Sequence, residues 1–159
     1  MTQSEHDELA LQVLKQFRVI YGSAKQQFRD IEETCGVSGS QLWLMHKIAA
    51  TPGIGVSELA NETSIHQSTC SQLLNKLQKR GLVVKVRGME DQRRVGLELS
   101  PEAHELLKKA PGPAEGVLQS ALKHLNSKEL DTLAEHLSGL ISQLRIRNEH
   151  YANKHLSDI

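Results

Sequence analysis

A run of polar residues at positions 67–80 carries side chains that could bind the edges of base pairs. The hydrogen-bonding members of this run are Gln67, Ser68, Thr69, Ser71, Gln72, Asn75 and Lys76. Gln and Asn can each form two hydrogen bonds with adenine, and Ser and Thr reach bases or phosphates. Lys79 and Arg80 stand at the end of the run and are better placed to contact phosphates. The run predicts a surface that reads duplex DNA, although every amphipathic helix also has a solvated polar face.

A second basic group surrounds an acidic pair further along the chain. It consists of Arg87, Arg93 and Arg94, with Glu90 and Asp91 between them. Arginine side chains at a hairpin tip could enter the narrow minor groove, where the negative potential of DNA is enhanced. A carboxylate aimed at DNA would repel it, so we expect Asp91 to bond Arg93 or the local backbone and to stiffen the tip. The alternative is a generic basic hairpin that keeps a strand edge from aggregating.

Charge is polarised along the chain, although the net charge is zero. Residues 66–94 include seven basic and two acidic residues, which gives this segment a net charge of +5. The remainder holds 12 basic and 17 acidic residues and carries −5. A basic segment within a neutral chain favours a nucleic-acid partner for that segment.

Apolar residues spaced three or four apart predict the helices that must position the polar run. A first long helix should cover residues 7–34, with apolar positions at Ala10, Val13, Phe17, Ile20, Ala24, Phe28 and Ile31. A second helix should cover 41–50, capped by Ser38 to Ser40, and an edge strand should follow at 54–56. Ser57 would cap a short helix over 58–63. After a three-residue turn, the helix at 67–80 would bury Cys70, Leu73, Leu74 and Leu77.

Two strands and two further helices complete the predicted order. Strands at 82–87 and 94–99 would join through a hairpin tip at 88–92. Ser100 and Pro101 predict the start of a helix, which Pro111 and Pro113 must interrupt or kink. The last helix would be capped at Ser127 and would present an apolar stripe: Leu130, Leu133, Leu137, Leu140, Ile141 and Leu144. Such a stripe needs an apolar partner.

Two helices joined by a short turn and followed at once by a hairpin describe a winged helix-turn-helix. The predicted fold class is therefore mainly α with a small β wing. In this arrangement the second helix of the pair enters the major groove.

The same segments resemble the MarR family of transcriptional regulators. The resemblance rests on Leu59 and Ala60, on residues 68–71 and 73–83, on 90–94 and on 97–100. Its most specific part is the Asp-x-Arg signature at Asp91 and Arg93, set at the usual distance from the Leu-x-x-x-Gly-Leu-Val segment at 77–83. The resemblance implies a single MarR-type domain over 1–159, with a DNA-binding lobe at 40–100 and dimerisation helices at 7–34 and 101–150.

The resemblance also implies an obligate homodimer that binds double-stranded DNA at an imperfect palindrome, most often as a repressor. Control would come from a small molecule or an oxidant. Ser57 joins the residues expected to contact DNA. The chain departs from the family at His66, where Ser or Thr usually caps the helix, at Gln67, where Pro is common, and at Gln72, where Arg is frequent. These departures predict a different operator preference.

Members of the family commonly bind aromatic carboxylates between the dimerisation helices and the DNA-binding lobe. Arg18, Tyr21, Trp43 and His46 could line such a pocket here. Trp43 could equally be a partly buried packing residue.

Cys35 is the candidate for redox sensing, because some MarR-type proteins sense oxidants through a cysteine. A sensing thiol needs nearby positive charge to lower its pKa, whereas Asp30, Glu32 and Glu33 precede Cys35. Cys70 is expected to be a small core residue. The eight histidines show no metal-ligand spacing, so no metal and no other cofactor is expected.

Other function classes find less support in the sequence. Catalytic triads, paired carboxylates and phosphate-binding glycine loops are absent from suitable contexts, so an enzyme is not expected. The polar N-terminus and the lack of a long apolar run predict neither export nor a membrane span, and the cytoplasm is the expected location. The remaining rival is a winged helix that binds proteins, whose recognition face should be apolar or acidic.

Overall fold

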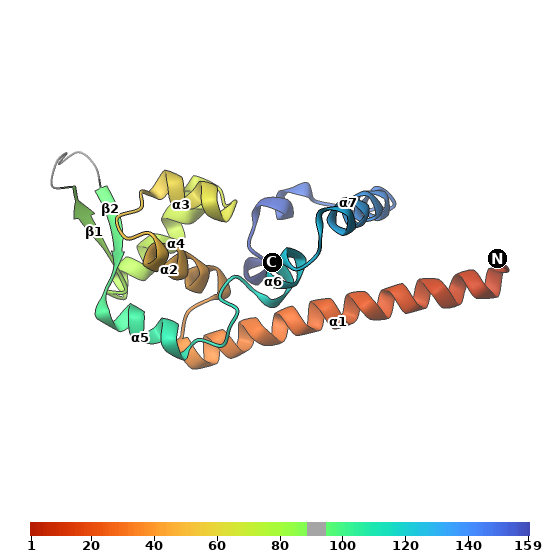
Figure 1. Cartoon of the computed structure of the whole chain (residues 1–159), viewed down its shortest axis with the longest axis horizontal. Coiled ribbons are helices and arrows are strands. Elements are labelled where there is room, and N and C mark those ends of the chain that lie inside the picture. The colour runs from red at the N-terminus through yellow and green to blue at the C-terminus, as the bar shows by residue number, and fades with distance from the viewer. Residues whose placement is uncertain (89–94) are drawn as a thin grey trace.

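A long N-terminal helix runs from one end of the molecule to a small lobe of helices with a β-hairpin at the other end (Figure 1). The computed structural model describes residues 1–88 and 95–159. Its elements are α1 (Gln3–Cys35), α2 (Gly39–Ala50), α3 (Val56–Thr63), α4 (Gln67–Lys79), β1 (Val83–Arg87), β2 (Val95–Leu99), α5 (Pro101–Lys109), α6 (Val117–Lys123), α7 (Ser127–Ser142) and the 3-10 turns η1 (Glu149–Asn153) and η2 (Leu156–Asp158). The predicted class, mainly α with a small β wing, is confirmed.

Helix α2 lies at the centre of the lobe and contacts α3, α4, α5 and β2. Side chains from all these elements form one apolar core, whose largest fully buried members include Leu42, Leu44, Met45, Ile48, Leu59, Leu74, Leu77 and Leu97. All of these residues except Leu97 of β2 belong to helices and stand on their buried faces, and the burial of the whole set stabilises the lobe.

The helix ends follow the capping residues with two corrections. Ser38 and Gln41 form a reciprocal capping box at α2, and the Ser100 side chain caps α5, both as expected. Helix α3 begins at Val56 with Gly55 as its N-cap, so Ser57 is not the cap and the expected strand at 54–56 shrinks to one bridge from Ile54 to Leu97. Helix α7 is capped by Asn126, not Ser127, because Asn126 forms a capping box with Glu129.

The Pro-rich turn after α5 is tied to α1 through a buried glutamine. Gln27 is 6% exposed, its amide nitrogen donates to the Pro113 carbonyl at 2.7 Å, and its amide oxygen accepts from the Val117 N–H at 2.7 Å. This contact starts α6, a helix that the sequence analysis did not predict. Gln27 stands between Ala24 and Ile31 on the apolar side of α1. A polar residue at that position is the signal in the sequence that could have indicated a buried contact with another segment.

The wing is an antiparallel hairpin in which Val83 pairs with Leu99 and Arg87 with Val95. The segment before α3 approaches β2 closely, where the Gly53 N–H donates to the Leu97 carbonyl at 2.9 Å. A Cβ added at Gly96 would lie 2.6 Å from the Gly53 carbonyl oxygen and 2.8 Å from the Gly53 Cα. Only glycine therefore fits at position 96 without moving backbone.

Helix α1 buries only its last third. Ala24 and Ile31 are buried, whereas Val13, Phe17 and Ile20 of the same predicted stripe are exposed. Helix α7 stands apart from α1 in Figure 1 and leaves Leu130, Leu140 and Ile141 exposed. Within residues 1–88 and 95–159, none of the helices combines the length and the apolar character needed to cross a bilayer.

The Gly96→Ala variant is expected to unfold more easily than the wild type, by about 1–3 kcal/mol, because the new methyl group forces the Gly53 backbone away. Denaturant unfolding followed by circular dichroism measures this difference. The control is Gly22→Ala in α1, where an added Cβ would meet no atom within 4 Å. Equal stability of the Gly96→Ala variant and the wild type would contradict the close approach.

Candidate nucleic-acid interface

The candidate interface is built on α4, which has two chemically distinct faces. Cys70, Leu73, Leu74 and Leu77 are buried in the lobe, as predicted. The exposed predicted contacts are Gln67, Ser68, Gln72, Asn75, Lys76 and Lys79, while Thr69 and Ser71 are half-buried. The side chains with donors and acceptors therefore point outward from a helix whose other face is fixed in the core.

The turn between α3 and α4 sets the direction of α4. Ser64 adopts a left-handed conformation with φ 54°, and the buried Ile65 follows it. The buried Thr63 hydroxyl donates to the Leu59 carbonyl at 2.7 Å, so its polar atom is satisfied within α3. His66 is the N-cap of α4 but forms no side-chain cap bond, and its ring stays exposed. Ser57 is also exposed, on the first turn of α3.

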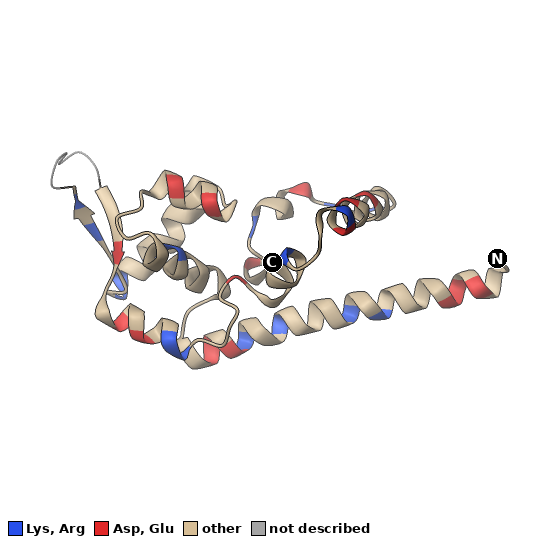
Figure 2. Ribbon diagram, in the orientation of Figure 1, with Lys and Arg blue, Asp and Glu red and all other residues tan. Residues whose placement is uncertain are grey.

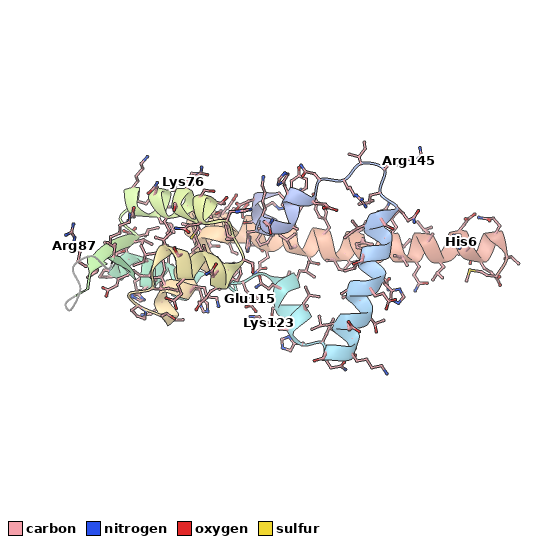
Figure 3. The ribbon with its side chains drawn as sticks, turned by 90° about the horizontal axis from the view of Figure 1, so that it is seen from above. His6, Lys76, Arg87, Glu115, Lys123 and Arg145 are labelled. Atoms are coloured by element: carbon pink, nitrogen blue, oxygen red, sulfur yellow. The ribbon has the colours of Figure 1, made fainter. Side chains whose placement is uncertain are left out.

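The basic residues of β1 lie at the same end of the molecule as Lys76 of α4. Lys85 and Arg87 are exposed on β1. Figure 3 shows Arg87 at the end of the hairpin and Lys76 on α4, at the end of the molecule opposite to His6. Figure 2 shows Lys and Arg on the hairpin, whereas α3 carries acidic residues. The predicted contacts Arg93 and Arg94 and the orienting residue Asp91 lie outside the described residues.

Arg80 has a structural contact that the sequence did not indicate. Its guanidinium donates a hydrogen bond to the carbonyl of Gly36, the residue that ends α1. The last turn of α1 contains no basic residue of its own, so Arg80 supplies the positive charge that a helix C-terminus favours. Arg80, which was predicted to contact phosphate, therefore also joins α4 to α1.

The four predicted pocket residues do not come together in one cavity. Trp43 lines a cavity of about 290 Å³, and Tyr21 lines a neighbouring one of about 370 Å³. The two cavities share the wall residues Ala24, Phe28, Leu118 and Leu156. Neither Arg18 nor His46 lines either of them. Lys25 and Arg29 line the second cavity instead, and the Lys25 ammonium lies 4.9 Å from the centre of the Tyr21 ring.

Both cysteines are free and buried. The Cys35 sulfur lies 3.8 Å from the Leu106 carbonyl oxygen, and burial raises the pKa of its thiol, with Lys109 opposing this. Burial raises the pKa of Cys70 to about 11. Since the thiolate is the reactive form, these surroundings disfavour oxidation of either thiol.

The sequence of this chain is similar to those of known transcriptional regulators. Residues 35–94 match the family model described as MarR family. The chain is 29% identical over 105 residues to the HTH-type transcriptional regulator FarR of Neisseria gonorrhoeae, which covers 66% of this chain and 69% of FarR. It is 22% identical over 144 residues to the homoprotocatechuate degradative operon repressor of Escherichia coli, covering 91% and 95% of the two chains.

A solved structure shares the fold at low sequence identity. The S. aureus MepR–DNA complex superposes with a TM-score of 0.55 at 16% identity, covering 91% of this chain and 97% of that one. The fold and the polar outer face of α4 define a winged helix-turn-helix protein. Over residues 35–94 the chain is similar to the MarR family of transcriptional regulators.

The contact of Arg80 with α1 predicts different effects for two neighbouring basic residues. Arg80→Ala should lower the free energy of unfolding by about 1 kcal/mol, because a charged hydrogen bond to a helix end is lost. Lys79→Ala should leave stability within about 0.5 kcal/mol of the wild type, since an exposed side chain is removed. Denaturant unfolding of both variants checks this, and equal stabilities would argue against the structural role of Arg80.

Proposed function

We propose that this chain is a homodimeric repressor that binds a palindromic operator in double-stranded DNA through α4 and the wing. The observation that carries the proposal is the division of α4 into a buried leucine face and an exposed face of amides, hydroxyls and ammonium groups. Major-groove base edges present hydrogen-bond donors and acceptors, which is the chemistry that such a face complements. The MarR-family match and the relatives named as regulators support the same function.

The uncovered apolar faces of α1 and α7 support a dimer. Exposed apolar side chains on these two helices include Leu9, Val13, Phe17, Ile20, Leu130, Leu140 and Ile141. Contiguous apolar surface of this kind marks an interface. A second copy of the chain would cover it with the same helices, which assigns residues 7–34 and 101–150 to dimerisation and 40–100 to DNA binding.

An effector would act by changing the separation of the two α4 helices. Two recognition helices of a dimer must meet major grooves about one DNA turn apart, ~34 Å. The cavities beside Trp43 and Tyr21 adjoin the junction of α1 with the lobe, where a bound molecule could alter that separation. The second cavity is lined by the cations Lys25 and Arg29 and by one carboxylate, Glu32, and this excess of positive charge favours a small aromatic or other carboxylate. Such a molecule shifts DNA binding only by its differential affinity for the two separations.

Duplex affinity should fall as salt rises, because each phosphate contact releases a counterion, with a logarithmic slope of about −0.9 per contact. Gel retardation of the DNA upstream of the protein's own coding sequence, at several salt concentrations, measures the slope.

Gln72→Ala should weaken binding by about 1–3 kcal/mol, whereas Gln78→Ala, toward the end of α4, should not. Absence of retardation at low salt would refute DNA binding and favour a protein-binding winged helix.

Leu140→Glu should convert the dimer into a monomer, because a buried unpaired carboxylate at the interface is costly. Thr132→Glu is the matched control, since helical spacing places residue 132 away from the apolar stripe of α7. Light scattering after size-exclusion chromatography gives the mass of each variant. A wild-type mass near 17.7 kDa would contradict the dimer.

A further inference from the structure

The segment after α7 turns back and packs into the junction between α1 and α2. The ring of His155 is centred 5.5 Å from the Phe28 ring of α1 and 5.6 Å from the Trp43 ring of α2. His155 is 8% exposed, although the preceding turn η1 is exposed throughout. A single imidazole therefore touches both the long helix and the central helix of the lobe.

Hydrogen bonds join the same segment to the first turn of α2. The Ser40 N–H donates to the Ser157 Oγ at 2.9 Å, and the Ser40 hydroxyl donates to the Asp158 Oδ1 at 3.1 Å. The first N–H groups of a helix lack partners within it, and a carboxylate is favoured at that end. Residues far along the chain thus complete the start of α2.

Glycine at position 39 permits this close approach. A Cβ added at Gly39 would lie 2.7 Å from the Phe28 ring and 3.0 Å from the Ser157 Cβ. The packing of α1, α2 and the returning segment is therefore tight, and the segment fits this junction specifically.

We propose that residues 155–158, called the clamp below, fix the angle between α1 and α2 and so regulate DNA binding by the lobe. The inference rests on the proposed function, because α1 is there assigned to dimerisation and α2 to the lobe that carries α4. A dimer binds its operator only in the fraction of molecules whose α4 separation fits the DNA. A docked clamp restricts the angle, whereas a released clamp lets it vary and lowers that fraction.

The clamp also forms a wall of both cavities. His155 lines the cavity beside Trp43, and Leu156 lines that cavity and the neighbouring one. A molecule entering either cavity must contact the clamp or displace it. A molecule bound in either cavity could therefore change the α1–α2 angle by displacing the clamp.

Acid is expected to release the clamp. Burial lowers the pKa of His155, while the Asp158 carboxylate and the Glu115 backbone act in the opposite direction. Glu62 and Lys154 are the other charged residues that line the cavity with it. A released His155 would titrate near its ordinary value of 6.5, so it binds protons more readily than the docked ring. The docked clamp is therefore most stable above pH 6.5 and becomes less stable as the pH falls below that value toward the lowered pKa.

The test compares His155→Ala with His150→Ala, a matched control at an exposed histidine of the same segment. Three quantities are measured on the full-length dimer: amide exchange of Ser40, the pH dependence of Trp43 fluorescence, and affinity for the operator found by retardation. Trp43 is the single tryptophan of the chain, so the emission reports on the surroundings of that one side chain, which include the His155 ring. His155→Phe keeps a ring between Phe28 and Trp43 and serves if His155→Ala fails to fold.

In His155→Ala, exchange of the Ser40 amide should become about fivefold faster, because its hydrogen bond to Ser157 is released. The fluorescence titration should disappear, and operator affinity should fall about fivefold. In His155→Phe the titration should disappear, and exchange should stay slower than in His155→Ala, because the ring packing remains although the bonds between His155 Nδ1 and Ser157 are lost. His150→Ala should match the wild type. If His155→Ala binds the operator as tightly as the wild type, the clamp has no regulatory role, and if it binds more tightly, the proposal that a docked clamp favours DNA binding is overturned. If the wild type itself binds no duplex, the proposed function fails, and the regulatory role is overturned with it.

Discussion

The burial of one face of α4 against α2 is the interaction on which the rest of the structure depends. Leu73, Leu74 and Leu77 enter the same core as Leu42 and Met45 of α2. Because a helix turns once in 3.6 residues, fixing these leucines inside forces the amides and hydroxyls of α4 outward. If the apolar positions were spread around α4, its polar side chains would not share one face, and the wing would not lie beside a continuous polar surface.

The exposed apolar side chains of α1 and α7 are the second feature that shapes the proposed assembly. The first two thirds of α1 and most of α7 carry exposed apolar side chains, and the part of the chain that the structure describes does not cover them. Exposed apolar area of this extent is unfavourable in water. A second copy would remove it and, by the proposal above, would set two α4 helices at a fixed separation. Assembly and DNA reading are then linked through α1, which reaches from one region to the other.

Contacts across long sequence separations decide how α1 meets the lobe. Arg80 reaches Gly36 at the end of α1, and Gln27 binds the turn before α6. His155 and Ser157 pack at the start of α2. Each joins the long helix or its neighbour to residues distant in sequence, so the junction is held by polar bonds at its rim and aromatic packing inside. Such a junction can hold one angle and still release it at modest cost, since few groups need to separate.

The sequence by itself determined the elements and the faces of the lobe. Local spacing and capping residues specified α2, α4 and the wing strands within a few residues, because helix period and caps are short-range properties. Gly55, not Ser57, is the N-cap of α3, and α6 was missed because its first N–H is bonded by Gln27 of α1. Arg80 was assigned to phosphate from its charge and its place at the end of the helix, and Tyr21 and Trp43 were assigned to one pocket. Only the tertiary structure decided that Arg80 binds Gly36, that Tyr21 and Trp43 line separate cavities, and that His155 lies between Phe28 and Trp43. The physical reason is that a contact between distant residues depends on how every intervening helix packs, and no local pattern carries that information.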